Sequence, residues 1–454
     1  MPGRSPQRPP PPGGPYLVVG LARSGQAAAR LLAARGERVI GADSGSPAGA
    51  AGLADIGVEV LLDVDGTQAA QRARCVIKSP GVRPDAPAIV AARERGLPVI
   101  GELELAWRLL PNAICAVTGT NGKTTVAELL GHVWRTAGEP VAVAGNVGTP
   151  LASLVGEVSA DATIVCEASS FQLEDTDAFA PQCAALLNVA PDHLDRHGSL
   201  DRYLAAKLRI FRNQGNDDAC VYNGSDPALR GVDLGGCGRR VAFCREPGAG
   251  QDCQAVVVGP LLELWGEPLL AVDELALLGP HNADNAAAAA AAAAMGIERE
   301  AIAAALRGFG GVPHRLERVA ELDGVLYVND SKATNVAAAG AALRSFERGV
   351  HVILGGSVKG AGFDELAEPV IERCAGAYLI GAAAERIEAD LAPAWEAGIA
   401  RRRCETLAEA VVLAAEAARR GDVVLLAPAC ASFDAYRDFE ARGEHFRELV
   451  EGLR

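Results

Sequence analysis

Short apolar runs alternate with Ala- and Leu-rich stretches along most of the chain, and this alternation limits the possible folds more than any other feature. From Tyr16 onward, the apolar run YLVVG is followed by SGQAAARLLAARG and then by the apolar run RVIGAD. Alternation of this kind is typical of βαβ units, in which helices connect parallel strands and cover the sheet. The sequence therefore predicts an α/β protein with mostly parallel sheets and flanking helices.

The alternation divides into three segments, which we expect to be three domains. Residues 1–15 (MPGRSPQRPPPPGGP) precede them, and their proline content predicts a disordered tail. The first domain is expected over residues 16–101 and the second over residues 102–312. The sequence GGVP at 310–313 is a candidate linker, so the third domain is expected over residues 313–454.

Charge and hydropathy argue against two classes of partner. The formal net charge is -14, whereas proteins that bind nucleic acids neutralise phosphates with Lys and Arg. No uninterrupted apolar stretch reaches the roughly 18 residues that suggest a membrane span. The first 15 residues lack the apolar segment of a secretory signal. We therefore expect a cytoplasmic protein with no nucleic-acid partner and no membrane span, and we expect a monomer.

The cysteines indicate a reducing environment. The chain has 11 of them, they are scattered, and no pair has Cys-x-x-Cys spacing. We therefore expect neither a disulfide framework nor a zinc knuckle, and most of these side chains should be small buried apolar groups.

The run GTNGKTT follows the apolar stretch ICAV and precedes a helical stretch, which is the context of a phosphate-binding loop. In such loops, backbone N–H groups surround the phosphates, a lysine reaches the β and γ oxygens, and a hydroxyl binds Mg²⁺. Val117 stands where the full pattern has its first glycine, and a chance glycine turn is the weaker alternative. We interpret the run as an ATP loop whose candidate contacts are Gly119, Thr120, Asn121, Gly122, Lys123, Thr124 and Thr125.

A second glycine-rich turn, GLARSG, is an imperfect dinucleotide fingerprint because Ala22 replaces its middle glycine. Asp43 ends the next apolar run, where the fingerprint has its ribose-binding acid. The methyl group of Ala22 would hinder a pyrophosphate, although Arg23 and Ser24 could contact a phosphate at the helix N-terminus. A nicotinamide cofactor, another nucleotide-like ligand and a simple strand-to-helix turn all remain open.

Candidate metal ligands follow two further apolar runs. Glu167 ends TIVCE, and His193 lies in APDHLDRH after CAALLNV. Because the carboxyl ends of parallel strands meet at one edge of a sheet, Thr124 and Glu167 are expected to form one Mg²⁺ site, with a second near His193. His193 and His197 also have the i, i+4 spacing of a zinc pair, which is the weaker alternative.

Motifs between about Gly20 and Phe446 closely resemble the Mur ligases of peptidoglycan synthesis. These motifs are GTNGKTT, EASSFQLE, NVAPDHLDRH, YLAAKLRIF, GPHNADN, GVPHRLE, NDSKATN, LGGSVKG and PACASFDAYRDFEARGEHF. We therefore expect Rossmann-like N-terminal and C-terminal domains on either side of a central P-loop ATPase-like domain. Within the family, NDSKATN and the C-terminal segment indicate the ligase that adds D-glutamate to UDP-N-acetylmuramoyl-L-alanine. They argue against the relatives that add diaminopimelate and against folate-polyglutamate synthesis.

The resemblance implies a reaction and the residues that perform it. Such ligases use ATP to convert a carboxylate into an acyl phosphate, which an amine attacks to form an amide. By the resemblance, Lys123 and Thr124 hold the phosphates and a first Mg²⁺, Glu167 binds that ion, and His193 helps to bind a second. Lys207 in YLAAKLRIF aligns with the family's carbamylated lysine, in which CO₂ converts the amine into an anionic metal ligand. Read without the resemblance, Lys207 is a charge on a helix surface.

The resemblance assigns the remaining site residues to three ligands. Further ATP contacts are Asn282, Asn285, Arg315, Asp330 and Lys332. The UDP substrate is assigned to Arg23, Ser24, Asp43 and Asn146, although Ser44 and Gly45 stand where some relatives have an Arg near the uridine. The D-glutamate is assigned to Thr334, Lys359, Ser432 and Phe439.

Two rival functions depend on single motifs. The GLARSG turn with Asp43 is compatible with a nicotinamide-dependent oxidoreductase. The GTNGKTT loop is compatible with an ATP-dependent binding or switch protein that has no ligase chemistry.

Overall fold

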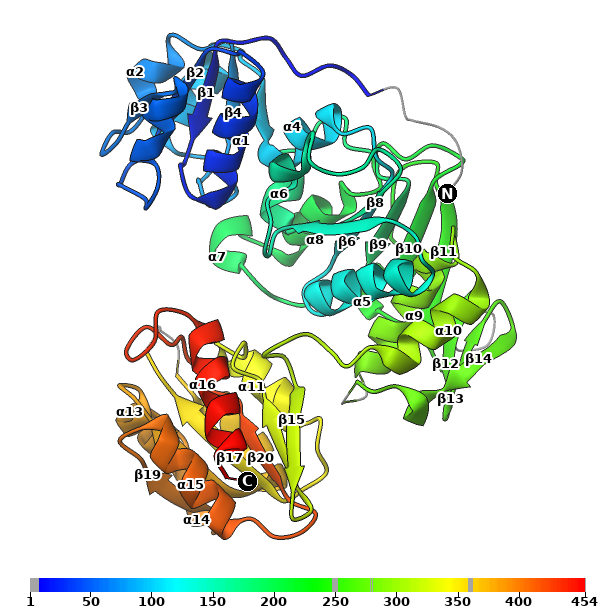
Figure 1. Ribbon diagram of the computed structural model, residues 1–454, viewed down its shortest axis with the longest axis vertical. Coiled ribbons are helices and arrows are strands. Elements are labelled where there is room, and N and C mark those ends of the chain that lie inside the picture. Colours follow the sequence, from blue (N-terminus) through cyan, green and yellow to red (C-terminus); the bar gives the residue numbers. More distant parts are fainter. Residues whose placement is uncertain (1–7, 247–251, 278, 280, 358–361, 454) are drawn as a thin grey trace. The chain divides into compact units, whose positions relative to one another are not determined.

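A computed structural model describes residues 8–246, 252–277, 279, 281–357 and 362–453 (Figure 1). The chain forms two compact units. The first unit comprises Met1–Glu274 and Ala283–Arg307, and the second comprises Leu275–Asn282 and Gly308–Arg454. Among the described residues, we find no helix long and apolar enough to cross a membrane.

The N-terminal part of the first unit is a parallel sheet with strand order β3-β2-β1-β4-β5. Its central strands are buried along their whole length, because helices cover both faces of such a sheet. The strand order reverses between β1 and β4, and ligands of open α/β sheets bind beyond the carboxyl ends of the strands at such a point. The elements are β1 (Tyr16–Val19), α1 (Arg23–Ala34), β2 (Val39–Ala42), β3 (Glu59–Leu61), α2 (Thr67–Ala70), β4 (Cys75–Lys78), α3 (Pro87–Glu94) and β5 (Val99–Gly101).

The rest of the first unit is built on a larger sheet with the order β14-β13-β12-β11-β10-β9-β6-β8-β7. The strands from β7 to β12 along this order pair in parallel, and β13 and β14 continue the sheet as antiparallel strands. The strands are β6 (Ile114–Thr118), β7 (Val141–Gly145), β8 (Thr163–Glu167), β9 (Cys183–Leu186), β10 (Ala219–Asn223), β11 (Arg239–Arg245), β12 (Ala255–Val258), β13 (Leu261–Leu264) and β14 (Glu267–Ala271). The helices are α4 (Glu102–Leu109), α5 (Lys123–Thr136), α6 (Ser170–Glu174), α7 (Leu194–His197), α8 (Leu200–Leu208), α9 (His281–Ala293) and α10 (Arg299–Gly308).

The second unit contains a sheet with the order β15-β16-β20-β17-β18-β19, in which only the pairing of β15 with β16 is antiparallel among the described residues. Successive strand residues enter two different cores, as the pleat of a strand requires. Val352 packs in one core and Ile353 in the other. The elements are β15 (Glu317–Leu322), β16 (Val325–Asn329), α11 (Val336–Leu343), β17 (Val350–Gly355), α12 (Ala367–Arg373), β18 (Cys374–Ile380), α13 (Ala384–Asp390), α14 (Ala392–Glu396), β19 (Ala400–Arg403), α15 (Leu407–Ala417), β20 (Val423–Leu426) and α16 (Phe439–Glu451).

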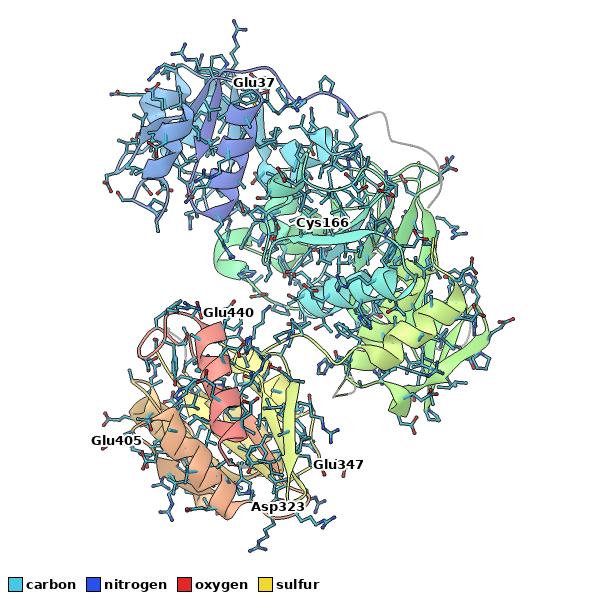
Figure 2. All side chains as sticks on the ribbon, in the orientation of Figure 1. Glu37, Cys166, Asp323, Glu347, Glu405 and Glu440 are labelled. Carbon is cyan, nitrogen blue, oxygen red and sulfur yellow. A yellow bond between two sulfur atoms is a disulfide. The ribbon has the colours of Figure 1, made fainter. Side chains whose placement is uncertain are left out.

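The predicted architecture is confirmed, because the sheets are mostly parallel and helices flank them (Figure 1). Figure 2 shows Cys166 of β8 inside the first unit, whereas Glu37 and Glu405 project from the surface. Many of the candidate site residues follow the carboxyl ends of strands, and open α/β sheets bind their ligands at this edge.

Residues 8–15 differ from the predicted disordered tail, and residues 1–7 lie outside the described part of the chain. The Arg8 guanidinium donates hydrogen bonds to the carbonyls of Trp107 and Asn112, at 2.7 and 2.6 Å, and also to that of Leu110. It lies 5.0 Å from the ring centroid of Trp107. The last carbonyls of a helix have no partner within the helix and attract cations, so Arg8 fits the end of α4.

The cysteines also differ in one respect from the sequence expectation. Cys244 of β11 is bonded to Cys253, with a Cα–Cα distance of 6.0 Å. The remaining cysteines of the described residues are free thiols, and all of them except Cys237 are buried. The bonded pair is nine residues apart, a spacing that matches no familiar cysteine motif.

Candidate active site

The loop from Gly119 to Gly122 joins β6 to α5 and is built from backbone conformations that suit glycine (Figure 1). Gly122 has φ +83° and precedes the first residue of α5, where a Cβ would lie 2.4 Å from Asn285 Oδ1. The Asn188 side-chain oxygen accepts hydrogen bonds from the N–H groups of Thr120 and Asn121, at 3.1 and 2.8 Å. The loop is therefore preformed, and it ends at a helix N-terminus, a place where backbone N–H groups bind phosphate.

Two lysines converge on one carbonyl of this loop. Lys123 Nζ donates to the Gly119 oxygen at 2.9 Å and to the Thr120 oxygen at 2.8 Å. Lys207 Nζ donates to the same Gly119 oxygen at 2.7 Å, although it comes from α8. The structure thus brings together Gly119, Lys123 and Lys207, three of the residues predicted to bind or act on ATP.

Lys207 is buried, which contradicts its reading as a helix-surface charge. The residue is 1% exposed, and its Nζ lies 4.3 Å from the ring centroid of Tyr203. Burial, with a smaller effect from the Lys123 ammonium, lowers the pKa of the Lys207 amine to about 7. A lysine with this pKa is largely uncharged at mildly alkaline pH, so it can act as a nucleophile.

Glu167 and Asn146 lie side by side at the ends of β8 and β7. Asn146 Nδ2 donates to Glu167 Oε1 at 2.9 Å, and the Asn146 N–H donates to the Glu167 carbonyl at the same distance. Glu167 is buried, as is Thr124 in the first turn of α5. Both residues are oxygen donors on neighbouring elements, because β6, which leads to α5, pairs with β8.

His193 begins α7 from a left-handed backbone conformation, with φ +52°. Its side chain is 49% exposed, and its ring centroid lies 4.8 Å from that of Phe171. Among the described residues, no three His, Cys, Asp or Glu side chains gather as a metal site. The oxygen donors Thr124 and Glu167 suit Mg²⁺, which commonly keeps waters and takes oxygens from nucleotide phosphates, whereas His193 offers a nitrogen.

The alternative of a zinc pair at His193 and His197 is not supported. His197 Nε2 lies 3.0 Å from the Ser170 hydroxyl, and His197 Nδ1 lies 3.1 Å from Glu174 Oε1. Both ring nitrogens of His197 are thus engaged by protein groups, and neither is available to a metal.

The N-terminal loop has the tight turn of a dinucleotide loop but uses its acid differently. Gly20 has φ +85°, and a Cβ on Gly25 would lie 1.8 Å from the Gly20 oxygen. Asp43 accepts hydrogen bonds from the N–H groups of Leu21, at 2.6 Å, and Gly45, at 2.9 Å. Asp43 therefore supports the loop itself, which weakens its interpretation as the ribose ligand of a nicotinamide cofactor.

Arg23 and Ser24 are the first residues of α1, directly after this turn. Arg23 is exposed and Ser24 is half-buried, so both can be reached from solvent. Ser79, which follows β4, donates to the Gly20 carbonyl at 2.6 Å. The turn is therefore fixed from both sides of the switch point, with the helix N-terminus open to an anion.

In the second unit, the predicted residues gather around the end of β16. The Leu316 N–H donates to Asp330 Oδ1 at 3.1 Å, next to Arg315 in the chain. Burial raises the pKa of the Asp330 carboxyl to about 6. Lys332 is fixed through its N–H, which donates to the His314 carbonyl at 3.1 Å. Arg315, Asp330 and Lys332 thus share one small scaffold.

The residues assigned to D-glutamate fall on neighbouring segments of the same unit, except that Lys359 lies outside the described residues. Lys332 Nζ lies 5.7 Å from the ring centroid of Phe439, and the Phe439 carbonyl accepts from Ser331 Oγ at 2.8 Å. Ser432 is buried, whereas Thr334 is half-buried. Asn282 also belongs to this unit, while Asn285 contacts the phosphate loop of the first unit.

Sequence reasoning missed Arg442, which organises this region. Arg442 is 1% exposed, and its guanidinium donates to Ser331 Oγ and to the Ser331 carbonyl, both at 2.9 Å. It also donates to the Cys430 carbonyl at 3.1 Å. Arg442 thus ties the segment of Lys332 to the segment of Ser432. An arginine in the polar stretch FEARGEHF gives no sign of burial, so no signal in the single sequence could have identified it.

Comparisons with known proteins show which family the chain resembles. The chain matches three domain families: "Mur ligase MurD-like, N-terminal domain" over residues 15–101, "Mur ligase middle domain" over 117–293, and "Mur ligase, glutamate ligase domain" over 314–430. A protein of Pelotomaculum thermopropionicum named "UDP-N-acetylmuramoylalanine--D-glutamate ligase" is 43% identical over 446 residues, which cover 96% of this chain and 97% of that protein. A protein of Acidobacterium capsulatum with the same name is 42% identical over 443 residues, covering 96% and 95%.

Solved structures show the same fold at lower identity. The UDP-N-acetylmuramate-alanine ligase of Thermotoga maritima aligns with a TM-score of 0.61 at 21% identity, covering 97% of this chain and 99% of that one. A pseudomurein peptide ligase type C from Methanothermus fervidus aligns with a TM-score of 0.56 at 18% identity, covering 97% and 100%. With relatives more than 40% identical along nearly its whole length, the chain belongs to the Mur ligase family.

Proposed function

We propose that this protein is an ATP-dependent ligase that adds D-glutamate to UDP-N-acetylmuramoyl-L-alanine during peptidoglycan precursor synthesis. The name of the relatives that are 43% and 42% identical supports the choice of substrates. The observation that carries the chemistry is the preformed loop after β6, on which Lys123 and the buried Lys207 converge at the Gly119 carbonyl. Such a loop holds a nucleoside triphosphate beside a second amine that can be modified.

The reaction couples phosphate transfer to amide formation. The carboxylate of the acceptor attacks the γ-phosphorus of ATP, which releases ADP and leaves an acyl phosphate. The amine of D-glutamate then attacks the acyl carbon, loses a proton and expels phosphate. Two anions must approach each other in the first step, so the cation of Lys123 and the backbone N–H groups at the start of α5 would offset their repulsion.

Magnesium would complete this charge control, because it polarises phosphoryl oxygens when it is bound. Thr124 and Glu167 are the proposed ligands of one ion, and His193 is a proposed ligand of a second. Their hydroxyl, carboxylate and imidazole groups belong to the first turn of α5, the end of β8 and the N-cap of α7. These residues would also orient the triphosphate toward the acceptor.

Lys207 is proposed to carry a carbamate that joins the metal ligands. The uncharged amine would add to CO₂ and lose one proton. The resulting carbamate is an anion, whereas an ordinary protonated lysine is a cation. Burial supports this step, because it lowers the pKa of Lys207 to about 7 and so raises the fraction of neutral amine. An ordinary lysine, with a pKa of about 10.4, is almost entirely protonated at neutral pH.

The remaining residues are proposed to bind the two organic substrates. Arg23, Ser24, Asp43 and Asn146 would serve the UDP substrate, because they follow strands of the first unit at its carboxyl edges. Thr334, Lys359, Ser432 and Phe439 would serve D-glutamate. Asn282, Asn285, Arg315, Asp330 and Lys332 would complete the ATP site.

The three domains would then divide the ligands among them. We propose residues 16–101 for the UDP substrate, residues 102–312 for ATP and residues 313–454 for the amino acid. We also propose, from the resemblance, a cytoplasmic enzyme that acts as a monomer.

Phosphate release tests this function directly. The purified protein is incubated with ATP, Mg²⁺ and UDP-N-acetylmuramoyl-L-alanine, and D-glutamate is compared with L-glutamate, meso-diaminopimelate and L-alanine. We expect release above background with D-glutamate alone. Release with a different amino acid would keep the ligase chemistry and change the substrate. Release that does not depend on any amino acid would instead favour a switch protein.

A further inference from the structure

Three polar side chains in the first unit form a relay of one hydrogen bond and one ion-pair contact, and none of the proposed roles uses it. His197, the last residue of α7, lies between Ser170 at the start of α6 and Glu174 at its end. The Ser170 hydroxyl is 3.0 Å from His197 Nε2, and Glu174 Oε1 is 3.1 Å from His197 Nδ1. A serine, a histidine and a carboxylate in this order are also the components of hydrolytic triads.

Burial argues against hydrolysis at this relay. Ser170 is 3% exposed and His197 is 4% exposed, so the Ser170 oxygen does not face a space that a substrate can enter. The Ser170 hydroxyl is hydrogen-bonded to Nε2, and the Glu174 carboxylate faces Nδ1 at ion-pair distance. The relay therefore holds the imidazole in one orientation.

The His197 ring connects this relay to the phosphate loop and to α8. It stacks on Phe171, with centroids 5.3 Å apart and an interplanar angle of 12°, and lies 5.1 Å from the Tyr203 ring. The Tyr203 hydroxyl is 3.3 Å from Thr120 Oγ1 of the loop. The same Tyr203 ring lies 4.3 Å from Lys207 Nζ. A shift of the His197 ring would therefore displace Tyr203 and alter its contacts with the loop and with Lys207.

The backbone on both sides of the relay carries the proposed metal ligands. Glu167 ends β8 three residues before Ser170, and His193 precedes α7. The His193 carbonyl accepts from the His197 backbone N–H at 3.0 Å, so both residues belong to one turn, which the His197 ring anchors against α6. The relay thus links the segments that carry Glu167, His193 and Lys207.

We infer that His197 is a positioning residue that holds the segments of Glu167, His193 and Lys207 at the spacing that bound metal requires. The inference rests on the proposed function, because it assigns no new ligand. Hydrogen-bonded neighbours of metal ligands generally orient those ligands and tune their affinity. Here the His197 ring connects the segments that carry all three of these residues.

The substitution His197→Phe tests the inference, because it keeps an aromatic ring and removes both the hydrogen bond to Ser170 and the contact with Glu174. The readout is the dissociation constant for Mn²⁺ in the presence of ATP, measured by electron paramagnetic resonance of the free ion. We expect this constant to rise about 10-fold, the lower end of the effect seen when a metal ligand loses its hydrogen-bonded neighbour. Ser170→Ala removes the hydrogen bond to Nε2 and Glu174→Gln removes the charge beside Nδ1, so each should weaken Mn²⁺ binding by a smaller factor.

A matched control comes from His351 in the second unit. Its ring is also buried, with Nδ1 3.1 Å from the Tyr378 hydroxyl and Nε2 3.4 Å from Asp422 Oδ2. His351→Phe should lower the melting temperature by a similar amount and leave Mn²⁺ binding unchanged. Wild-type affinity in His197→Phe, Ser170→Ala and Glu174→Gln would overturn the inference, as would an equal loss in His351→Phe. A wild-type protein that releases no phosphate would refute the proposed function, and this inference with it.

Discussion

Replacing Lys78 with methionine should show how burial changes the contribution of an ion pair to the free energy of unfolding. Lys78 ends β4, and its Nζ lies 2.5 Å from Asp175 Oδ2, with side-chain exposures of 0% and 7%. Arg72 and Glu59 are separated by the same 2.5 Å, but their side chains are 45% and 40% exposed. The two pairs share a distance and differ in burial, so comparing them isolates the effect of solvent.

The expected magnitudes follow from what each substitution leaves behind. Lys78→Met leaves the Asp175 carboxylate buried without its cation, and breaking a buried pair in this way costs about 3–5 kcal/mol of unfolding free energy. Arg72→Ala leaves Glu59 in solvent, where an exposed pair contributes little, so the loss should be much smaller. Burial already raises the pKa of Asp175 and lowers that of Lys78, so desolvation outweighs the attraction between them.

The loss in Lys78→Met should depend on pH. Without its cation, the folded-state pKa of Asp175 lies further above the unfolded value, so the folded state binds more protons than the unfolded state. Stability therefore falls as pH rises above the unfolded pKa of about 3.9. The deficit relative to wild type should be largest at neutral pH and should shrink as the pH is lowered toward that value.

Equilibrium urea unfolding at several pH values measures these quantities. The double variant Lys78→Met with Asp175→Leu should recover most of the loss, because apolar replacement of a whole buried pair is often neutral or stabilising. Equal losses in Lys78→Met and Arg72→Ala would refute the reasoning. A pH-independent deficit would refute the part that concerns the Asp175 carboxylate.

Three further outcomes are expected. Lys207→Ala should remove most of the phosphate release. High bicarbonate should not restore the activity, whereas a short-chain carboxylic acid should restore part of it by replacing the anionic ligand. Normal activity in this variant would exclude the carbamate. Lys123→Ala should lower kcat far more than it lowers the melting temperature, because Lys123 is half-buried and its role is to place a charge at the phosphates. Parallel losses of kcat and melting temperature would contradict this role. Arg8→Ala should lower the unfolding free energy by about 1–3 kcal/mol, because the Trp107 carbonyl in the last turn of α4 and the Asn112 carbonyl beyond it lose a charged donor. An unchanged urea midpoint would show that this contact contributes nothing.

Part of the candidate site could be read from local sequence. The loop with Lys123 and Thr124 was predictable because a strand, a glycine turn and a helix follow one another within a short segment. Glu167 was predictable as a strand end for the same reason. Arg442 and the Ser170–His197–Glu174 contacts were not, because each joins elements whose packing no local pattern encodes.

The sequence by itself determined the alternation of strands and helices, because that alternation depends on neighbouring residues and on apolar periodicity. It also determined the glycine positions of the phosphate loop. Tertiary structure alone decided that Lys207 meets the Gly119 carbonyl across 88 residues and that Lys78 meets Asp175 across 97 residues. Burial sets the chemical properties of these side chains. Burying an amine away from water lowers its pKa, and burying an ion pair raises the loss of unfolding free energy when one partner is removed. That burial arises only when distant segments pack together.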